Sequence, residues 1–227
     1  MCGRLDLSET PARWPVRFPK LLDDLDQGPW GTGLGFNVPP GTRLPVLVWN
    51  EDRSRMVAPG YFWGPYFRIQ GRWKQVINAK LERLNESRLW APAMRHGRRG
   101  VVPAAGYFEW QKTDSGSQPY YVTRKDGRPM ALAALIGSAP ATADGEREPT
   151  CVIVTRDPCG GIERIHRRMP VELTDAEVGQ WLNPEAVIDL KDLAADDPTA
   201  AWKWWPVSRA ANDPRNNGRE VLEPVEL

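Results

Sequence analysis

The sequence predicts an α+β fold with a predominantly antiparallel, barrel-like β core. Short β-type runs separated by proline and glycine dominate the first two-thirds of the chain, and helical patterns are few. The chain has 227 residues, of which 22 are Pro and 20 are Gly, and no composition break marks a linker. This length fits one domain, or at most two small ones, with a sizeable buried core.

The expected strands are six runs rich in apolar, β-branched and aromatic residues. They are Leu44–Trp49, Met56–Trp63, Gly106–Trp110, Tyr120–Thr123, Met130–Ile136 and Cys151–Thr155. The stretch Lys125-Asp126-Gly127 is expected to form a hairpin turn between two of them, because glycine tolerates the positive φ required there. The polar segment Pro140–Pro149 is expected to be a solvated loop.

Two helices are expected to flank this core. Spaced apolar residues and good helix formers indicate a helix within Lys80–His96, limited or kinked by Pro92. A second helix is expected to begin near Thr174, because Thr174 and Glu177 have the spacing of a capping box. It is expected to end by Asn183-Pro184.

Composition narrows the function classes. Lys and Arg number 30 against 29 Asp and Glu, so the net charge is close to zero. This balance argues against a protein that coats a polyanion along its whole surface, but it allows a local basic groove.

No run approaches the ~18 consecutive apolar residues of a membrane span, so a cytoplasmic protein with no membrane association is expected. The three cysteines, Cys2, Cys151 and Cys159, are unevenly spaced, and the chain has only two histidines. Neither a disulfide scaffold nor a metal site is expected.

The position of Cys2 is informative. Methionine aminopeptidases act when the second residue is small, and removal of Met1 would leave Cys2 with a free α-amine beside its thiol. The ordinary pKa values of these groups are ~7.7–8.0 and ~8.5, so both are partly deprotonated near neutrality. Such a 1,2-aminothiol condenses with an aldehyde to an imine, and the thiolate then closes a thiazolidine ring. An incidental cysteine at a frayed terminus is the alternative on position alone.

Met1-Cys2-Gly3-Arg4 resembles the start of two enzyme groups that expose an N-terminal cysteine. In class II glutamine amidotransferases the cysteine attacks the amide of glutamine. Arg-Gly and Asn-Gly elements would then be expected to hold the substrate carboxylate and form the oxyanion hole. Asn217-Gly218 lies at the extreme C-terminus, and there is no convincing counterpart elsewhere in the chain.

Six stretches, in order, resemble the motifs of the second group, the SRAP family (SOS-response-associated peptidase, abasic-site processing proteins). They are Met1–Arg4; Asn37-Val38-Pro39-Pro40; Trp63-Gly64 with Ile77–Glu82; Pro103–Trp110; Ile165–Pro170; and Pro206–Arg209. The resemblance implies one α+β domain over residues 1–227 with a twisted antiparallel β core. It also implies a monomer without cofactor that binds single-stranded DNA and traps abasic sites covalently through Cys2, protecting them in the DNA damage response. Such a protein would be nucleoid-associated when bound to DNA.

The resemblance also implies roles for three companions of Cys2. Asn78 matches an asparagine beside the cysteine, and its amide can both donate and accept. Glu109 matches an acid/base carboxylate, a task that partial burial helps by raising its pKa toward neutrality. His166 matches a histidine that shuttles a proton near its ordinary pKa of ~6.5.

Further residues are expected to contact DNA because they lie next to the reactive positions or in the same motifs. They are Arg4, Asn37, Pro40, Trp63, Lys80, Arg167, Arg168, Ser208 and Arg209.

The Arg95–Arg99 cluster either contacts DNA or forms a solvated face of the protein. Lys80 stands where the family commonly has arginine and loses bidentate phosphate geometry. Pro65, after Gly64, indicates a different loop beside the DNA groove.

The leading hypothesis is therefore an abasic-site crosslinking protein, with lyase activity through the imine as a further option. The second hypothesis is a cysteine peptidase or self-processing hydrolase that uses Cys2. The third is a DNA-associated module without chemistry, which retention of Met1 would favour.

Overall fold

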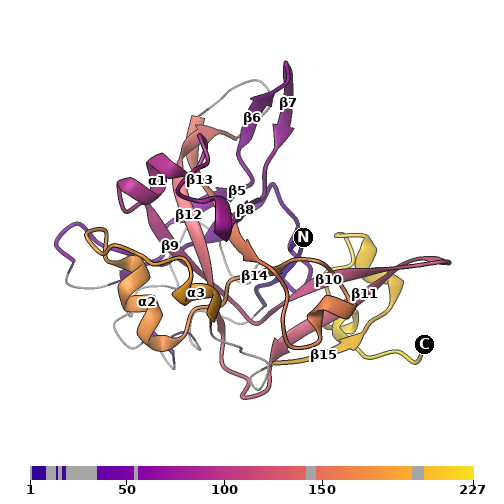
Figure 1. Ribbon diagram of the computed structural model, residues 1–227. Helices are drawn as coiled ribbons and strands as arrows, with labels where there is room; N and C mark the ends of the chain where they lie inside the picture. The colour runs from indigo at the N-terminus through magenta and orange to yellow at the C-terminus, as the bar shows by residue number, and fades with distance from the viewer. Residues whose placement is uncertain are drawn as a thin grey trace.

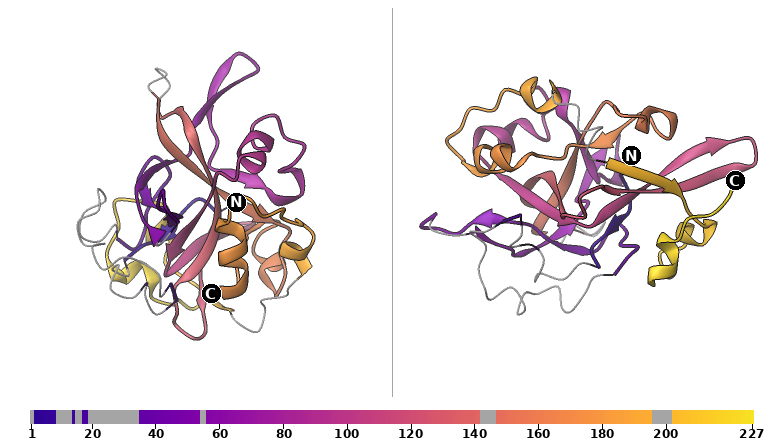
Figure 2. Two further views of the ribbon diagram at one scale, coloured as in Figure 1. Left: turned by 90° about the vertical axis from the view of Figure 1, so that its left-hand side faces the viewer. Right: turned by 90° about the horizontal axis from the view of Figure 1, so that it is seen from below.

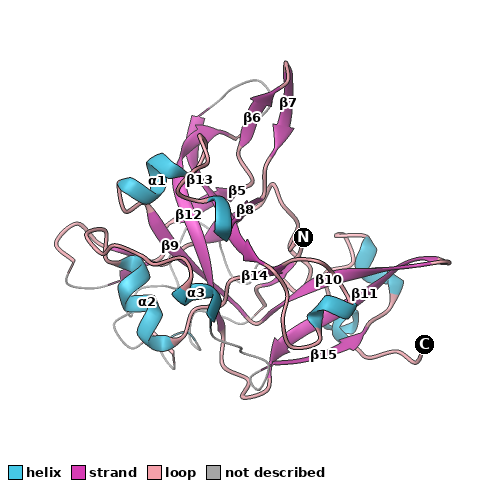
Figure 3. Ribbon diagram, viewed as in Figure 1, coloured by secondary structure: helices cyan, strands magenta, loops and turns pink. Residues whose placement is uncertain are grey.

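The computed structural model describes residues 2–8, 14, 17–18, 35–53, 56–141, 147–195 and 202–227. Strands dominate this part of the chain, and the helices are short and lie at the periphery (Figure 3). They are α1 (Ala91–Arg95), α2 (Asp175–Leu182), α3 (Asp192–Ala195) and the 3₁₀ helices η3 (Leu81–Arg83), η4 (Ile162–Arg164), η6 (Arg209–Asn212) and η7 (Arg219–Leu222). No helix among the described residues is long and apolar enough to cross a membrane.

A four-stranded antiparallel sheet carries the N-terminal strand. Its order is β1 (Leu5–Asp6), β10 (Gly106–Thr113), β11 (Gly116–Arg124) and β15 (Trp202–Pro206). The β10–β11 arm extends past the body of the molecule toward the C-terminal segment (Figure 2, right).

A seven-stranded sheet forms the other main layer. Its order is β2 (Arg43–Pro45), β5 (Gly60–Trp63), β13 (Arg147–Arg156), β12 (Met130–Pro140) and β9 (Arg99–Ala104), and β8 (Asn78–Lys80) and β14 (Met169–Pro170) also pair with β13. β5 and β8 run parallel to β13, and the other pairings are antiparallel. Two further ribbons are β3 (Val48–Trp49) with β4 (Met56–Val57), and β6 (Tyr66–Ile69) with β7 (Arg72–Gln75).

The expectation of a barrel-like core is wrong, because the two main sheets are not closed into a barrel. They pack face to face instead. Along β12, Met130, Leu132 and Ala134 face the cluster between the sheets, which also holds Cys2. The intervening Ala131, Ala133 and Leu135 face the cluster beneath α2. Because side chains alternate along a strand, this one strand is buried on both faces.

The six expected strand runs all carry strands, although the first two are each divided. Between β2 and β3 the chain turns to other partners: Val46 N donates to Pro59 O at 3.1 Å, and Leu47 forms a bridge with Val101. The turn expected at Lys125–Gly127 forms with Gly127 at φ 68°, but it is not a hairpin. Its flanking strands, β11 and β12, belong to different sheets, so the turn passes the chain from one layer to the other.

The helix expected over Lys80–His96 is wrong in its first half. Lys80 ends β8, which pairs with β13, and Leu81–Arg83 form only the single 3₁₀ turn η3. The α-helix α1 spans Ala91–Arg95 with Pro92 in its first turn. The second expected helix is confirmed: Thr174 Oγ1 accepts from Glu177 N, and Asn183 is the C-cap of α2. Within the expected loop 140–149, residues 147–149 belong to β13, and 142–146 lie outside the described residues.

Candidate active site

Cys2 lies in the seam between the two main sheets and is fully buried. β1 pairs with β10 so that Leu5 is opposite Tyr107, and Phe108 N donates to Arg4 O at 3.0 Å. Glu109 follows Phe108 on β10, and its carboxylate is near enough to act electrostatically on the Cys2 thiol. From the seven-stranded sheet, Asn78 Nδ2 donates to Cys2 O at 2.9 Å. Both sheets therefore fix the position of the cysteine.

Glu109 and His166 complete the group. Glu109 is 2% exposed on β10, and its Oε2 lies 3.7 Å from Nδ1 of His166. His166 follows η4, and its Nδ1 accepts from Arg168 N at 3.1 Å. Cys2, Asn78, Glu109 and His166, here called the reactive cluster, thus come from four segments far apart in the sequence. The sequence predicts all four.

Burial sets the protonation of the cluster. Desolvation raises the pKa of the Cys2 thiol well above its usual range, and the nearby Glu109 charge raises it further. Desolvation also raises the pKa of Glu109, while His166 opposes that shift. The thiol is therefore neutral at rest, and the carboxyl is displaced toward the pH range in which an acid/base group is effective.

Two buried polar atoms of the seam have no hydrogen-bond partner among the described residues. They are Oδ1 of Asn78 and the hydroxyl of Tyr107. Buried polar atoms are nearly always paired in folded proteins, so an unpaired atom calls for an explanation. Because Asn78 holds Cys2 O through its other amide atom, its Oδ1 is placed to accept a hydrogen bond from a bound molecule beside the cysteine.

A cavity of about 420 Å³ opens beside His166. It is lined by Trp110, Gln111, Lys112, Glu163, Arg164, Ile165, His166 and Arg167. Lys112, Arg164 and Arg167 are exposed, so cations outnumber carboxylates around this opening. The cavity therefore suits an anionic ligand.

Sequence reasoning missed Gln111 as part of this site. Its Nε2 donates to Arg164 O at 2.8 Å and its Oε1 accepts from Tyr120 OH at 3.2 Å, so it braces the loop that carries His166. The signal was present, because Gln111 is two residues beyond Glu109 and therefore on the same face of the strand.

Asn37, expected to contact DNA, is instead buried and occupied. Its Nδ2 donates to the carbonyl oxygens of Ala211, Asp213 and Asn216 at 3.2, 3.1 and 2.8 Å. Its Oδ1 accepts from Arg4 Nη1 at 2.8 Å. Asn37 thus fastens the C-terminal segment to the N-terminal strand, and every polar atom of its side chain is committed to that task.

Trp63 and Ser208 also have structural roles, and the expected DNA contact of the partly exposed Ser208 stays a prediction. Trp63 is fully buried and donates from Nε1 to Ile77 O at 3.0 Å, so no base can stack on it. Ser208 is the N-cap of η6 and accepts from Ala210 N. Arg209 is exposed on that helix and donates to Ser115 Oγ at 3.2 Å.

Arg168 differs from its neighbour Arg167. Arg168 is buried, donates to both carboxylate oxygens of Glu82 at 2.8 Å, and donates to Asp157 Oδ1 at 2.5 Å and Thr155 O at 2.6 Å. Its guanidinium is thus occupied by protein groups, contrary to the expected phosphate contact. Arg167 is exposed at the cavity.

The remaining expected contacts differ in exposure. Lys80 is exposed beside Asn78, and Pro40 is half-buried. Arg4 is half-buried, with its guanidinium 5.6 Å from the ring centroid of Trp110 and donating to Asn37 and Ala211 O. No group of three His, Cys, Asp or Glu side chains in the described part of the chain is placed to hold a metal ion.

Residues 1–214 match the family model for SOS response associated peptidase (SRAP). The chain belongs to the SRAP family. Among its curated SRAP relatives, the abasic site processing protein YedK of Escherichia coli is 33% identical, with 99% of this chain and all of the relative covered. The abasic site processing protein YoqW of Bacillus subtilis is 30% identical, with 83% of this chain and 85% of the relative covered.

Solved structures show the same SRAP fold. A protein from Bacteroides thetaiotaomicron superimposes with a TM-score of 0.76 at 20% identity, covering 99% of this chain and all of that one. A phage-related protein from Bordetella bronchiseptica superimposes with a TM-score of 0.69 at 30% identity, covering 92% of this chain and 95% of that one.

Proposed function

We propose that this SRAP protein captures abasic sites in single-stranded DNA as a covalent thiazolidine on Cys2, once Met1 has been removed. The observation that carries the proposal is a chain of contacts at Cys2: Asn78 donates to Cys2 O, the Glu109 charge acts on the thiol, and His166 Nδ1 lies 3.7 Å from Glu109 Oε2. The names of the curated relatives, abasic site processing proteins, support the choice of substrate. An abasic deoxyribose supplies the required electrophile, because its ring-opened form is an aldehyde.

The reaction forms two bonds to the same sugar carbon. The α-amine of Cys2 adds to the C1′ aldehyde, and loss of water gives an imine. The thiol sulfur then adds to that carbon, and its proton is transferred to the nitrogen. The product is a five-membered ring of sulfur, C1′, nitrogen, Cα and Cβ. No oxidant, metal or external nucleophile is needed.

Glu109 is proposed to move the protons. Sugar opening and loss of water both need an acid, and sulfur addition needs a base, because burial keeps the Cys2 thiol neutral at rest. A carboxyl whose pKa is raised by burial can serve in both directions. We propose that His166, whose Nδ1 lies 3.7 Å from Glu109 Oε2, relays a proton toward the cavity after a small approach of the two side chains.

Asn78 and the cationic rim are proposed to position the DNA. Asn78 Oδ1 accepts a hydrogen bond from a sugar hydroxyl or from the amine that becomes the imine nitrogen. Exposed Arg167, with Lys112 and Arg164 at the same cavity, attracts the flanking phosphates, and exposed Lys80 adds charge beside Asn78. If the DNA strand is cleaved at the imine stage, before the thiazolidine ring closes, the protein acts as a lyase. This outcome competes with the stable crosslink.

The test compares Cys2 variants on a single-stranded oligonucleotide that carries one abasic site. The unmodified protein is expected to give an adduct that survives denaturation without a reductant. Cys2→Ala keeps the amine but lacks sulfur, so its imine should be captured only when borohydride is added. Cys159→Ser is the matched control, because it removes a thiol without an adjacent amine and should leave the adduct unchanged. Equal adduct from Cys2→Ala without reductant would overturn the proposal.

A further inference from the structure

The β6–β7 hairpin projects from the seven-stranded sheet, away from the body of the protein (Figures 1 and 2). Residues 65–77 include three cations, Arg68, Arg72 and Lys74, and no carboxylate. All three cations are exposed, and none forms an ion pair within the described part of the chain. Trp73 is 43% exposed, and such exposure to water is unusual for so large an apolar side chain. The hairpin is therefore a basic, aromatic arm.

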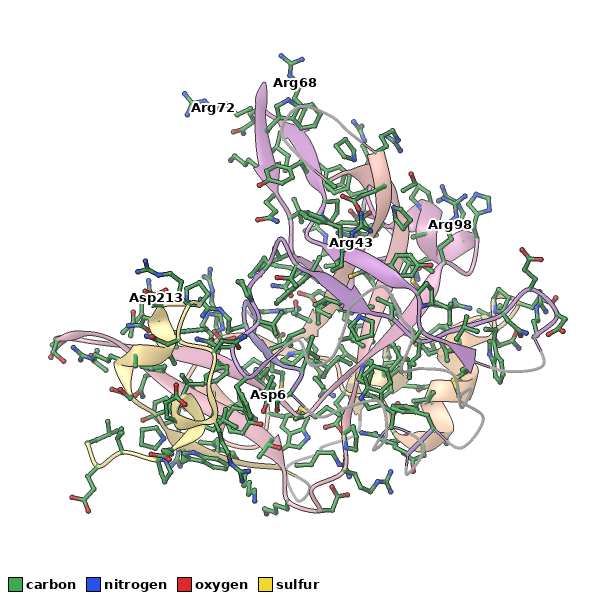
Figure 4. All side chains as sticks on the ribbon, turned by 180° about the vertical axis from the view of Figure 1, so that it is seen from behind. Asp6, Arg43, Arg68, Arg72, Arg98 and Asp213 are labelled. Carbon is green, nitrogen blue, oxygen red and sulfur yellow. The ribbon has the colours of Figure 1, made fainter. Side chains whose placement is uncertain are left out.

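The register of the hairpin separates its two faces. Phe67 is opposite Lys74, and Phe67 packs edge-on against Trp90 with ring centroids 5.5 Å apart, so this face turns toward α1. Arg68 is opposite Trp73, and cross-strand partners share a face. A cation and an exposed indole therefore lie side by side on the face that α1 does not cover. Figure 4 shows Arg68 and Arg72 reaching out from the tip.

The Arg68–Trp73 face leads back to the reactive cluster. At its base, Gln75 lies on the same face as Trp73, and Gln75 Nε2 donates to Trp63 O at 3.4 Å. Gly41 N donates to that same carbonyl at 2.9 Å, next to Pro40. Three residues beyond Gln75 is Asn78, which holds Cys2. The base of this face thus lies close in the chain to Asn78, the residue that contacts Cys2.

We propose that the Arg68–Trp73 face binds the single-stranded DNA that flanks the abasic site, an inference that rests on the proposed function. The phosphates of DNA are attracted to the cations of this hairpin, which has no carboxylates to oppose them. An unpaired base has an exposed face that can stack on the indole of Trp73. A duplex keeps its bases stacked on one another, so Trp73 selects a single strand. The four residues of β7 span about 13 Å, the length of about four stacked nucleotides.

Binding to undamaged, labelled oligonucleotides tests the hairpin separately from the covalent step. In a Cys2→Ala background, fluorescence anisotropy of a single strand of about 12 nucleotides is expected to show roughly tenfold weaker binding for Trp73→Leu. Trp73→Phe, which keeps an aromatic face, should restore most of the affinity. Arg68→Gln should weaken binding several-fold and reduce the salt slope by about 0.7.

Lys74→Gln is the matched control, since it removes the same charge from the opposite face of the same hairpin. It should weaken binding less than Arg68→Gln. Equal losses for the two variants, unchanged binding for Trp73→Leu, or a larger loss with duplex than with single-stranded DNA would each overturn the assignment. If the hairpin variants lose affinity but the unmodified protein forms no adduct with abasic DNA, the proposed chemistry fails and the binding surface stands.

Discussion

Two sets of motif residues differ in how many of their polar atoms have partners within the protein. The anchoring residues are Asn37, Trp63 and Arg168. Every polar side-chain atom of Asn37 and Trp63 is paired with a protein group. Arg168 pairs both of its Nη atoms, and its Nε has no partner among the described residues. In the reactive cluster, by contrast, Oδ1 of Asn78 is buried without a partner among the described residues. Glu109 is held in an environment that opposes its charge.

We propose that this difference separates residues that hold the fold from residues that react. Both sets lie in the stretches that resemble SRAP motifs, so motif membership alone does not distinguish them. A buried polar group with hydrogen-bond partners stabilises the fold. A buried polar group without them lowers the stability of the fold, and proteins retain such groups where function requires them. Substitutions in the reactive cluster should therefore lower the rate without lowering stability. Substitutions of the anchoring residues should lower stability first.

Glu109→Gln should have the largest effect, a loss of roughly 100- to 10,000-fold in the rate of adduct formation. The variant should also be more stable than the unmodified protein at neutral pH, by about 1 kcal/mol. Because the pKa of Glu109 is raised in the folded state, the native protein binds more protons than the unfolded chain. Stability therefore falls as the pH rises above the ordinary carboxyl pKa of ~4.3.

Urea unfolding across pH 4–8 measures this dependence. The difference between Glu109→Gln and the unmodified protein should widen as the pH rises and level off above the pKa of folded Glu109. A variant that is inactive and also less stable at every pH would place Glu109 among the anchoring residues.

Asn37→Ala should destabilise the protein by about 3 kcal/mol, because three carbonyl oxygens and Arg4 lose their partner together. Chemical denaturation gives the loss directly. At low temperature and saturating DNA, the rate of adduct formation by the folded fraction should stay close to that of the unmodified chain. A large fall in that rate at unchanged stability would make Asn37 part of the reaction.

Arg168→Gln should cost about 2 kcal/mol, less than a fully buried ion pair, since Glu82 and Asp157 are partly exposed and can be hydrated when the arginine is lost. The variant keeps the backbone N–H that donates to His166, but it loses the side-chain hydrogen bonds that hold this segment to Glu82 and Thr155 O, so His166 should shift. The pH profile of adduct formation should therefore change shape in this variant. A uniform decrease at every pH would indicate a purely structural role.

Thr174→Ala should have the smallest effect. It removes the capping interaction with Glu177 N at the start of α2 and should cost about 1 kcal/mol of unfolding free energy. Because α2 covers the face of the seven-stranded sheet away from the reactive cluster, the rate of adduct formation should not change. Differential scanning calorimetry and a rate measured well below the midpoint check both statements.

Local signals predicted local features. The capping box at Thr174 and the strand runs depend on residues within a few positions of one another, and the structure confirms them. Pairings across the fold could not be predicted in this way. β8 is a strand because β13 lies beside it, and the turn at Lys125–Gly127 passes between two sheets whose separation appears only in three dimensions.

The site follows the same rule. Motif resemblance singled out Cys2, Asn78, Glu109 and His166, and the structure places Asn78 against Cys2 and His166 beside Glu109; their roles in a reaction stay a prediction. It did not predict that Asn37 is bound to residues more than 170 positions away. Spacing carries no information about which partner satisfies a polar atom.

Intact mass spectrometry of the protein mixed with abasic single-stranded DNA tests the central claim most directly. The predicted product has the mass of the Met1-less protein plus the oligonucleotide minus one water. That mass should not change on borohydride treatment, because a thiazolidine has no reducible C=N bond. An adduct that gains two hydrogen atoms on reduction would identify an imine that never closed. The absence of any adduct from protein with a free Cys2 α-amine would contradict the account.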